Sequence, residues 1–245
     1  MPTAPSDILR QKARGVSVGL FAAPLGRLDE AVRELTLWQA GIAHFDVMDG
    51  VFVPQITAGP AFVAALGTGV LRDVHLMVEN PAAHVDSFAD AGADLITVHA
   101  EAPGAKLALD AVRAASERLG RPILTGLAVM PSTPVESLAP LLAPVPDLLL
   151  VLALDPRDGK PADFTRANQR IAALREAVAP ARPLMAIDGG VTLDTISAAT
   201  EAGPDMVVSG SAIFRAPDPE AAYRSLAQAW SAKARPFATA ETRNA

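Results

Sequence analysis

Short apolar runs alternate with longer amphipathic segments along most of this chain. Runs rich in Val, Ile and Leu predict strands at Val16–Ala22, His44–Met48, Asp73–Val78, Leu95–His99, Ile123–Val129, Leu148–Leu152, Leu184–Ile187 and Met206–Val208. Apolar residues at helical spacing predict helices at Arg27–Gln39, Ala82–Ala91, Ala105–Leu119, Pro134–Leu142, Thr165–Val178, Leu193–Ala202 and Pro219–Ala232. The connection from Pro54 to about Gly69 holds only a short helical candidate.

The regular alternation of strand and helix predicts the fold class. Parallel strands need helical crossovers, so this order favours an α/β protein with a parallel sheet. Eight such units predict a single closed (β/α)8 TIM barrel, and the lack of a Gly-x-Gly-x-x-Gly turn after the first strand disfavours a dinucleotide-binding sheet. We expect one barrel domain at residues 14–233. An N-terminal extension at 1–13 and a C-terminal tail at 234–245 are both expected to have little order.

Composition narrows the function classes. Half of the 245 residues are hydrophobic, which is enough for a large core, but no long apolar run predicts a membrane span. The chain has no cysteine, so disulfides and thiolate metal sites are excluded. A net charge of −6 offers no basic surface for nucleic acid. We therefore expect a cytoplasmic protein that binds neither membranes nor nucleic acid.

Titratable side chains stand inside or at the end of three predicted strands. His44 and Asp46 share one face of the second strand, His75 lies on the third, and Asp188 ends the seventh. Each residue alone has a purely structural explanation, such as a hydrogen-bonded core histidine or a turn aspartate. The carboxyl ends of barrel strands meet at one face, however, so the four are expected to converge. Two imidazoles and two carboxylates form a ligand set for a divalent transition metal.

Glycines follow the last two predicted strands. Gly189 and Gly190 come after the seventh strand, while Gly210 and Ser211 come after the eighth. Barrel enzymes commonly bind phosphate at these two turns through backbone N–H groups. Tight turns that need positive φ also explain the glycines, and both explanations can hold together.

These motifs resemble the ribulose-phosphate 3-epimerase family. The matching segments occur in the family's order over about residues 16–216. They are His44-Phe-Asp-Val-Met-Asp-Gly50 with Phe52-Val-Pro54, Asp73-Val-His-Leu-Met77 with Asn80-Pro81, Gly92-Ala-Asp-Leu-Ile-Thr-Val-His99, Gly126-Leu127 with Pro131-x-Thr-Pro134, Asp188-Gly-Gly190, and Val208-Ser-Gly-Ser-Ala-Ile-Phe214.

The resemblance implies a barrel of the ribulose-phosphate-binding type and an epimerase that inverts C3 of a ketose phosphate. The simplest substrate is D-ribulose 5-phosphate, converted to D-xylulose 5-phosphate through an enediolate. By resemblance, His44, Asp46, His75 and Asp188 would hold one zinc, iron, manganese or cobalt ion. Asp46 and Asp188 would exchange the C3 proton on opposite faces, with Met48 and Met77 as apolar walls. A homo-oligomer is also implied.

Several positions depart from the family pattern. Gly19 stands where the first strand usually carries a serine, and Leu152 replaces a methionine. Val51 and Gln55 replace a histidine and an asparagine in the loop after the second strand. The usual Gly-rich loop after the sixth strand is replaced by a charged candidate lid that includes Arg157, Asp158, Gly159 and Lys160.

These departures leave alternatives open. The chain could epimerise a different ketose phosphate, or it could be a catalytically silent sugar-phosphate-binding barrel. A decarboxylase or a Schiff-base aldolase on the same barrel is disfavoured, because none of the predicted strands contains a lysine.

Overall fold

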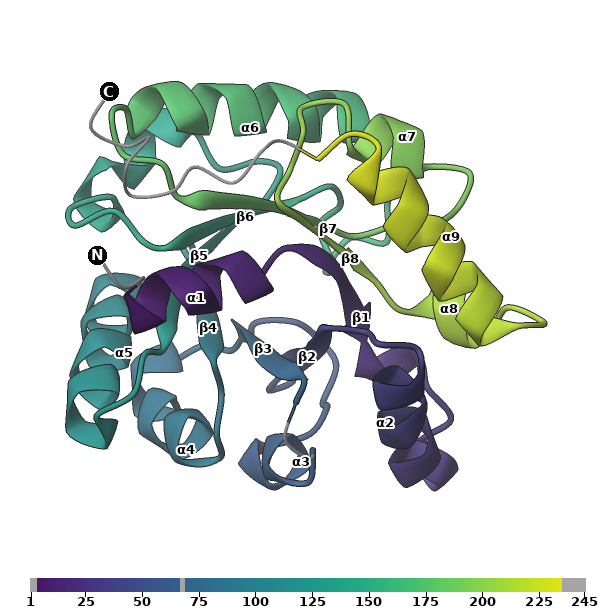
Figure 1. Ribbon diagram of the computed structural model, residues 1–245. Helices are drawn as coiled ribbons and strands as arrows, with labels where there is room; N and C mark the ends of the chain where they lie inside the picture. Colours follow the sequence, from purple (N-terminus) through teal and green to yellow (C-terminus); the bar gives the residue numbers. More distant parts are fainter. Residues whose placement is uncertain (1–3, 67–68, 235–245) are drawn as a thin grey trace.

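The computed structural model describes residues 4–66 and 69–234, and its eight strands close into one parallel barrel (Figure 1). Each strand pairs with its neighbours in sequence, and β1 pairs with β8 to complete the ring. The predicted (β/α)8 fold is therefore confirmed. The strands are β1 (Gly15–Gly19), β2 (Ile42–Met48), β3 (Leu71–Met77), β4 (Leu95–His99), β5 (Leu124–Val129), β6 (Leu148–Leu152), β7 (Leu184–Asp188) and β8 (Met206–Ser209).

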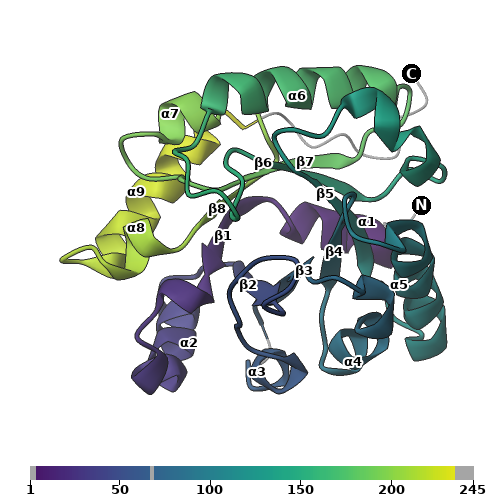
Figure 2. The same cartoon turned by 180° about the vertical axis from the view of Figure 1, so that it is seen from behind.

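Helices connect the strands and pack around the barrel, as the view from behind also shows (Figure 2). The α-helices are α1 (Pro5–Lys12), α2 (Leu28–Leu37), α3 (Pro60–Ala64), α4 (Val85–Asp90), α5 (Ala105–Leu119), α6 (Phe164–Ala177), α7 (Ile196–Ala199), α8 (Ser211–Phe214) and α9 (Pro219–Ser231). The 3₁₀ helices are η1 (Leu20–Ala22), η2 (Leu25–Arg27), η3 (Pro81–Ala83) and η4 (Val135–Leu141). Within the described ranges, no helix is both long and apolar enough to cross a membrane.

Several predicted elements differ from the structure. The first strand ends at Gly19, and the three residues after it form η1. The helix expected at Pro134–Leu142 is the 3₁₀ helix η4, which contains Pro140; proline lacks the N–H that an α-helix interior needs. The helix expected at Leu193–Ala202 is shorter in the structure, where α7 covers only Ile196–Ala199.

Within the N-terminal extension, residues 5–12 form helix α1. Arg10 anchors this helix by donating to the Asp147 carboxylate at 3.2 Å and to the Arg182 carbonyl at 2.7 Å. Asp147 lies one residue before β6 and Arg182 lies two residues before β7, so α1 lies at the amino ends of the strands. Of the tail predicted at 234–245, residues 235–245 lie outside the described part of the chain.

The core is divided by the barrel wall. One apolar cluster lies between the strands and the surrounding helices, and a second fills the barrel interior. The interior cluster includes one residue near the start of seven strands, namely Ile42, Leu71, Leu95, Leu124, Leu148, Leu184 and Met206. Side chains alternate along a strand, so the residues two and four positions further on point to the same interior, nearer the carboxyl ends. The functional residues occupy these later positions.

Candidate metal centre and substrate cavity

The inward-facing side chains of β2, β3 and β7 change from apolar to polar toward the carboxyl ends. On β2, Ile42 is followed by His44 and Asp46, while on β3 Leu71 is followed by Asp73 and His75. The register places Asp46 beside His75 and His44 beside Asp73. Asp188, the last residue of β7, reaches the same place from across the barrel. The four predicted ligands therefore converge as expected.

The distances within this cluster fit a single metal ion. Nε2 of His44 lies 3.1 Å from Oδ1 of Asp46 and 3.9 Å from Oδ2 of Asp188. Nδ1 of His75 lies 3.3 Å from the same Asp46 oxygen and 3.5 Å from the Asp188 oxygen. All four ligand atoms lie within 4.8 Å of one another. Two atoms bound to one tetrahedral ion at 2.0–2.2 Å would be roughly 3.3–3.6 Å apart, so the four can share an ion with small adjustments.

A buried carboxylate orients His44. Nδ1 of His44 lies 2.7 Å from Oδ2 of Asp73, and the Ser17 hydroxyl donates to the same oxygen at 2.8 Å. His44 is fully buried and Asp73 is only 1% exposed. Because a carboxylate accepts, Nδ1 carries the proton and Nε2 is directed at the cluster. A carboxylate behind a ligating histidine fixes its orientation and makes it a stronger donor to a metal.

A second chain of contacts orients His75. Nε2 of His75 lies 2.8 Å from Nε2 of His99, and Nδ1 of His99 lies 3.1 Å from Oε2 of Glu101. The carboxylate of Glu101 accepts from His99 Nδ1, so His99 Nε2 is left as the acceptor for the His75 Nε2–H. This assignment directs Nδ1 of His75 at the cluster. Glu101 is itself held by the Met130 N–H at 2.9 Å.

The pKa shifts show that the cluster favours positive charge between its carboxylates. Burial by itself lowers the pKa of His44, but Asp73 and Asp46 outweigh burial and raise it well above its ordinary value. The pKa of His75 is also raised, since hydrogen bonds to Asp188 and Asp46 outweigh burial. The pKa of Asp46 is lowered, because the two histidines outweigh its desolvation. A divalent ion can replace the protons on both imidazoles, so the residues fit a metal.

His99 behaves differently from the two predicted histidine ligands. Burial lowers the pKa of His99 to about 4, against the opposing effect of Glu101. The imidazole of His99 is therefore neutral near pH 7, as its role as an acceptor from His75 requires.

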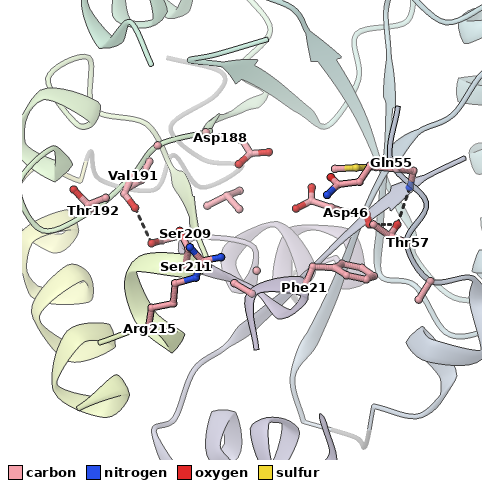
Figure 3. Close-up of a pocket in the computed structure, with 18 of the residues that line it drawn as sticks. Phe21, Asp46, Gln55, Thr57, Asp188, Val191, Thr192, Ser209, Ser211 and Arg215 are labelled. Atoms are coloured by element: carbon pink, nitrogen blue, oxygen red, sulfur yellow. Dashed lines mark hydrogen bonds between the residues drawn. The ribbon is translucent and has the colours of Figure 1, made fainter. Parts of the chain in front are cut away.

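A cavity of about 670 Å³ opens above the cluster (Figure 3). Asp46 and Asp188 line it, and Met48 and Gln55 form part of one wall. The Thr57 hydroxyl supports this wall by donating to the Asp46 carbonyl at 2.7 Å and accepting from the Met48 N–H at 2.8 Å. Met77 is 2% exposed and packs in the barrel interior, outside the cavity lining.

The glycine turns predicted to bind phosphate form the opposite wall. Gly189, Gly190, Gly210 and Ser211 all line the cavity. Gly190 has φ +74°, and a Cβ there would lie 2.7 Å from the Ala162 methyl. A Cβ on Gly210 would lie 2.8 Å from the carbonyl oxygen of Gly19. Bulkier residues do not fit these positions without movement, so the backbone of both turns stays open to the cavity.

The charges of the candidate lid are paired within the loop. Arg157 makes a two-pronged contact with Asp155, at 2.8 Å from Nε and 2.7 Å from Nη2, and lies 5.8 Å from the centre of the Phe52 ring. Lys160 pairs with Asp158 at 2.9 Å. Gly159 between them has φ +66°. Neither cation lines the cavity.

The sequence reasoning missed Ser17, Asp73, Glu101 and Arg215. Asp73 stands two residues before His75 and Ser17 two residues before Gly19, so strand alternation already places both on the inward face. Strand alternation in the sequence could therefore have identified both residues. Glu101 and Arg215 lie beyond the strands, in segments whose side-chain directions alternation does not predict.

Comparison with known proteins agrees with this geometry. A model of the "Ribulose-phosphate 3 epimerase family" matches residues 15–214. A ribulose-phosphate 3-epimerase from Synechocystis sp. is 36% identical over 210 residues, covering 83% of this chain and 88% of the relative. The enzyme of that name from Mycobacterium tuberculosis is 37% identical over 217 residues, covering 86% and 90%.

Solved structures extend the likeness at the level of fold alone. A 3-hexulose-6-phosphate synthase from Salmonella typhimurium superposes with a TM-score of 0.64 at 18% identity, covering 89% of this chain and 99% of that one.

Proposed function

This chain belongs to the ribulose-phosphate 3-epimerase family, an isomerase family, and we propose that it is a metal-dependent enzyme that inverts C3 of a ketose phosphate. D-ribulose 5-phosphate, converted to D-xylulose 5-phosphate, is the simplest substrate. The enzyme class follows from family membership, whereas the substrate, the metal and the residue roles are the proposal.

The observation that carries the proposal is the pairing of Asp46 and Asp188 at one end of the cavity. The two carboxylates come from β2 and β7, between which β8 and β1 lie in the barrel, and they contact the same two histidines. Both line the cavity, with side chains that are 25% and 14% exposed. A substrate carbon between them would have one carboxyl group on each face, which is the arrangement that inversion by proton transfer needs.

In this mechanism one aspartate, as a carboxylate, removes the C3 proton, which lies next to the ketose carbonyl. The electron pair moves onto the carbonyl oxygen and an enediolate results. The other aspartate, as a carboxylic acid, returns a proton to C3 from the opposite face. The reverse reaction exchanges the two roles, so each group must serve as both acid and base.

His44, Asp46, His75 and Asp188 would hold one divalent ion of zinc, iron, manganese or cobalt. When bound, such an ion supplies Lewis acidity that stabilises the negative charge of the enediolate. The protein's own contribution is to orient both imidazoles, through Asp73 on one side and through His99 and Glu101 on the other. Met48 adds an apolar wall that excludes water from the reacting centre.

The test is proton NMR of the metal-loaded protein with D-ribulose 5-phosphate in D2O. We expect loss of the C3 proton signal and the appearance of D-xylulose 5-phosphate. Asp46→Asn and Asp188→Asn should each slow this exchange by roughly a thousandfold or more, since each removes an acid–base group, typically worth 10²–10⁴ in rate, and also weakens a metal ligand. Metal content is measured in every variant, so that loss of the ion is separated from loss of proton transfer.

Asp205→Asn is the matched control, because Asp205 precedes β8 at the far end of the barrel and pairs with Arg14. Full exchange in both active-site variants, with metal bound, contradicts the two-aspartate mechanism. Exchange with a different ketose phosphate keeps the mechanism and changes the substrate. Gly19 and the altered lid favour one further candidate, a silent sugar-phosphate-binding barrel. Binding of several ketose phosphates without any deuterium uptake would support it.

A further inference from the structure

The cavity has opposite charges at its two ends. Its ionisable lining residues within the described ranges are Asp46, Asp188 and Arg215. The two carboxylates lie at the metal-binding cluster, whereas Arg215 follows α8 on the side of the glycine turns. Figure 3 shows the Arg215 side chain extending from the end of α8 toward Ser209 and Val191, across the cavity from Gln55 and Thr57.

The guanidinium of Arg215 has no hydrogen bond or ion pair with any residue that the structure describes. The backbone N–H of Arg215 donates to the Ser211 carbonyl at 3.1 Å. Arg215 is exposed at the cavity, so the charge is accessible to a solute. Five N–H donors in a planar fork suit the paired oxygens of a phosphate group.

The glycine turns place further donors on the same side of the cavity as Arg215. Gly189, Gly190, Gly210 and Ser211 line the same part of the cavity. The Ser209 hydroxyl is already used, since it donates to the Val191 carbonyl at 2.8 Å. In a chain with a net charge of −6, a local cation favours the binding of a phosphate dianion, because backbone N–H groups alone carry no full charge.

The cations of the candidate lid are already paired with carboxylates. Arg157 is held by both oxygens of Asp155, and Lys160 is held by Asp158. Breaking the Arg157 pair to bind a phosphate would expose the Asp155 carboxylate to the same anion. Arg215 has no such competing partner in the described part of the chain.

We propose that Arg215 is the cationic side chain that binds the phosphate of the substrate, beside the glycine turns. This inference deepens the proposed function and rests on it for the identity of the substrate. It assigns the chain a preference for phosphorylated over neutral ketoses, and it explains how phosphate is retained although the Gly-rich loop after β6 is absent. Arg215 acts on binding and leaves the proton transfers at Asp46 and Asp188 unchanged.

The test uses full-length Arg215→Ala, with Arg215→Lys as the conservative variant. Arg224→Ala is the matched control, because Arg224 is exposed on α9, pairs with Glu220 and does not line the cavity. Arg157→Ala tests whether Arg157 of the candidate lid binds the phosphate instead. Two readouts are taken on folded protein: binding of inorganic phosphate, followed by ³¹P NMR, and KM and kcat for D-ribulose 5-phosphate and for unphosphorylated D-ribulose.

We expect Arg215→Ala to weaken phosphate binding and to raise KM for the phosphorylated ketose by about tenfold to a hundredfold, the effect of losing a charge-assisted hydrogen-bonded pair. The kcat value and the parameters for D-ribulose should change little. The Arg215→Lys protein should have a KM for the phosphorylated ketose between those of the unsubstituted protein and of Arg215→Ala, since lysine keeps the charge but lacks the planar guanidinium. Arg224→Ala should match the unsubstituted protein.

Unchanged phosphate binding in Arg215→Ala overturns the proposal, and so does a larger loss in Arg157→Ala. Equal losses of activity on D-ribulose and its phosphate also overturn it, because they indicate a general structural effect. The phosphate titration does not depend on turnover. If no ketose phosphate is epimerised but Arg215→Ala still loses phosphate binding, the proposed function fails and the role of Arg215 stands.

Discussion

Replacing Asp73 by asparagine tests whether the carboxylate behind His44 tunes the metal centre. Asp73 contacts His44 Nδ1 at 2.7 Å and is 1% exposed, so water screens this pair little. The asparagine oxygen can still accept from Nδ1, so the variant removes the charge while keeping the hydrogen bond. Loss of such a partner typically weakens metal binding by about 10- to 100-fold, which corresponds to roughly 1.4–2.7 kcal/mol.

The expected loss can be compared with the electrostatics of the pair. Two unit charges about 4 Å apart interact by roughly 4 kcal/mol at an effective dielectric constant near 20. The metal-bound imidazole carries only part of a unit charge, so a fraction of this energy is at stake. Ser17→Ala removes one hydrogen bond to Asp73 and leaves the carboxylate, so we expect only a few-fold loss.

The assay is competitive titration of zinc or cobalt against a chelator of known affinity. It is run at a pH above the titration of His44, because Asp73→Asn also lowers the pKa of His44 and so reduces competition from protons. The lower pKa of His44 strengthens metal binding, whereas loss of the Asp73 charge weakens it. Near neutral pH the first effect would mask the second. Asp147→Asn is the control: it makes the same substitution at the amino end of the barrel, where Asp147 contacts Arg10 and Thr125.

The expected order of metal affinity is the unsubstituted protein and Asp147→Asn first, then Ser17→Ala, then Asp73→Asn. An unchanged affinity in a folded Asp73→Asn protein would refute the reasoning. A larger loss in Ser17→Ala than in Asp73→Asn would refute it too, because Ser17 acts only through Asp73 in this account.

Two further predictions concern the metal and the N-terminal helix. Removing the metal with a chelator should abolish C3 exchange and lower the unfolding temperature, since an ion at a thousand times its Kd stabilises the fold by about 4 kcal/mol. Adding back zinc, manganese, cobalt or iron(II) should restore both, and a chelated protein with unaltered exchange and melting would contradict the metal site. Arg10→Ala should lower the free energy of unfolding by roughly 1–3 kcal/mol, because it leaves the Asp147 carboxylate without its cation. Urea unfolding measures this loss, and C3 exchange should be unchanged because Arg10 lies at the opposite end of the barrel.

The sequence was sufficient to predict the barrel and the four residues of the candidate metal centre. Each strand is a local apolar run, and eight strand–helix repeats leave few topologies other than a closed parallel barrel. Strand alternation then places His44 and Asp46 on the same face, and barrel closure carries His75 and Asp188 to the same end. These inferences depend on short-range periodicity and on one general property of the fold, so they hold without knowledge of side-chain contacts.

The elements that differed depend on interactions beyond the local pattern. Helix α1 is held at the amino ends of the strands by Arg10, whose partners lie 137 and 172 residues away along the chain. No periodicity within residues 5–12 indicates those partners.

What the sequence determined by itself is the fold and the identity of the groups at the reacting end of the cavity. Only the tertiary structure decided which charged groups are free to act. Arg157 and Lys160 look equivalent to Arg215 in the sequence, but the first two have carboxylate partners and Arg215 faces the cavity without one among the described residues. The same holds for Asp73 and Glu101, which support the candidate metal centre through their contacts with His44 and His99. The physical reason is that secondary structure follows from neighbours in sequence, whereas the pairing of a charge depends on neighbours in space.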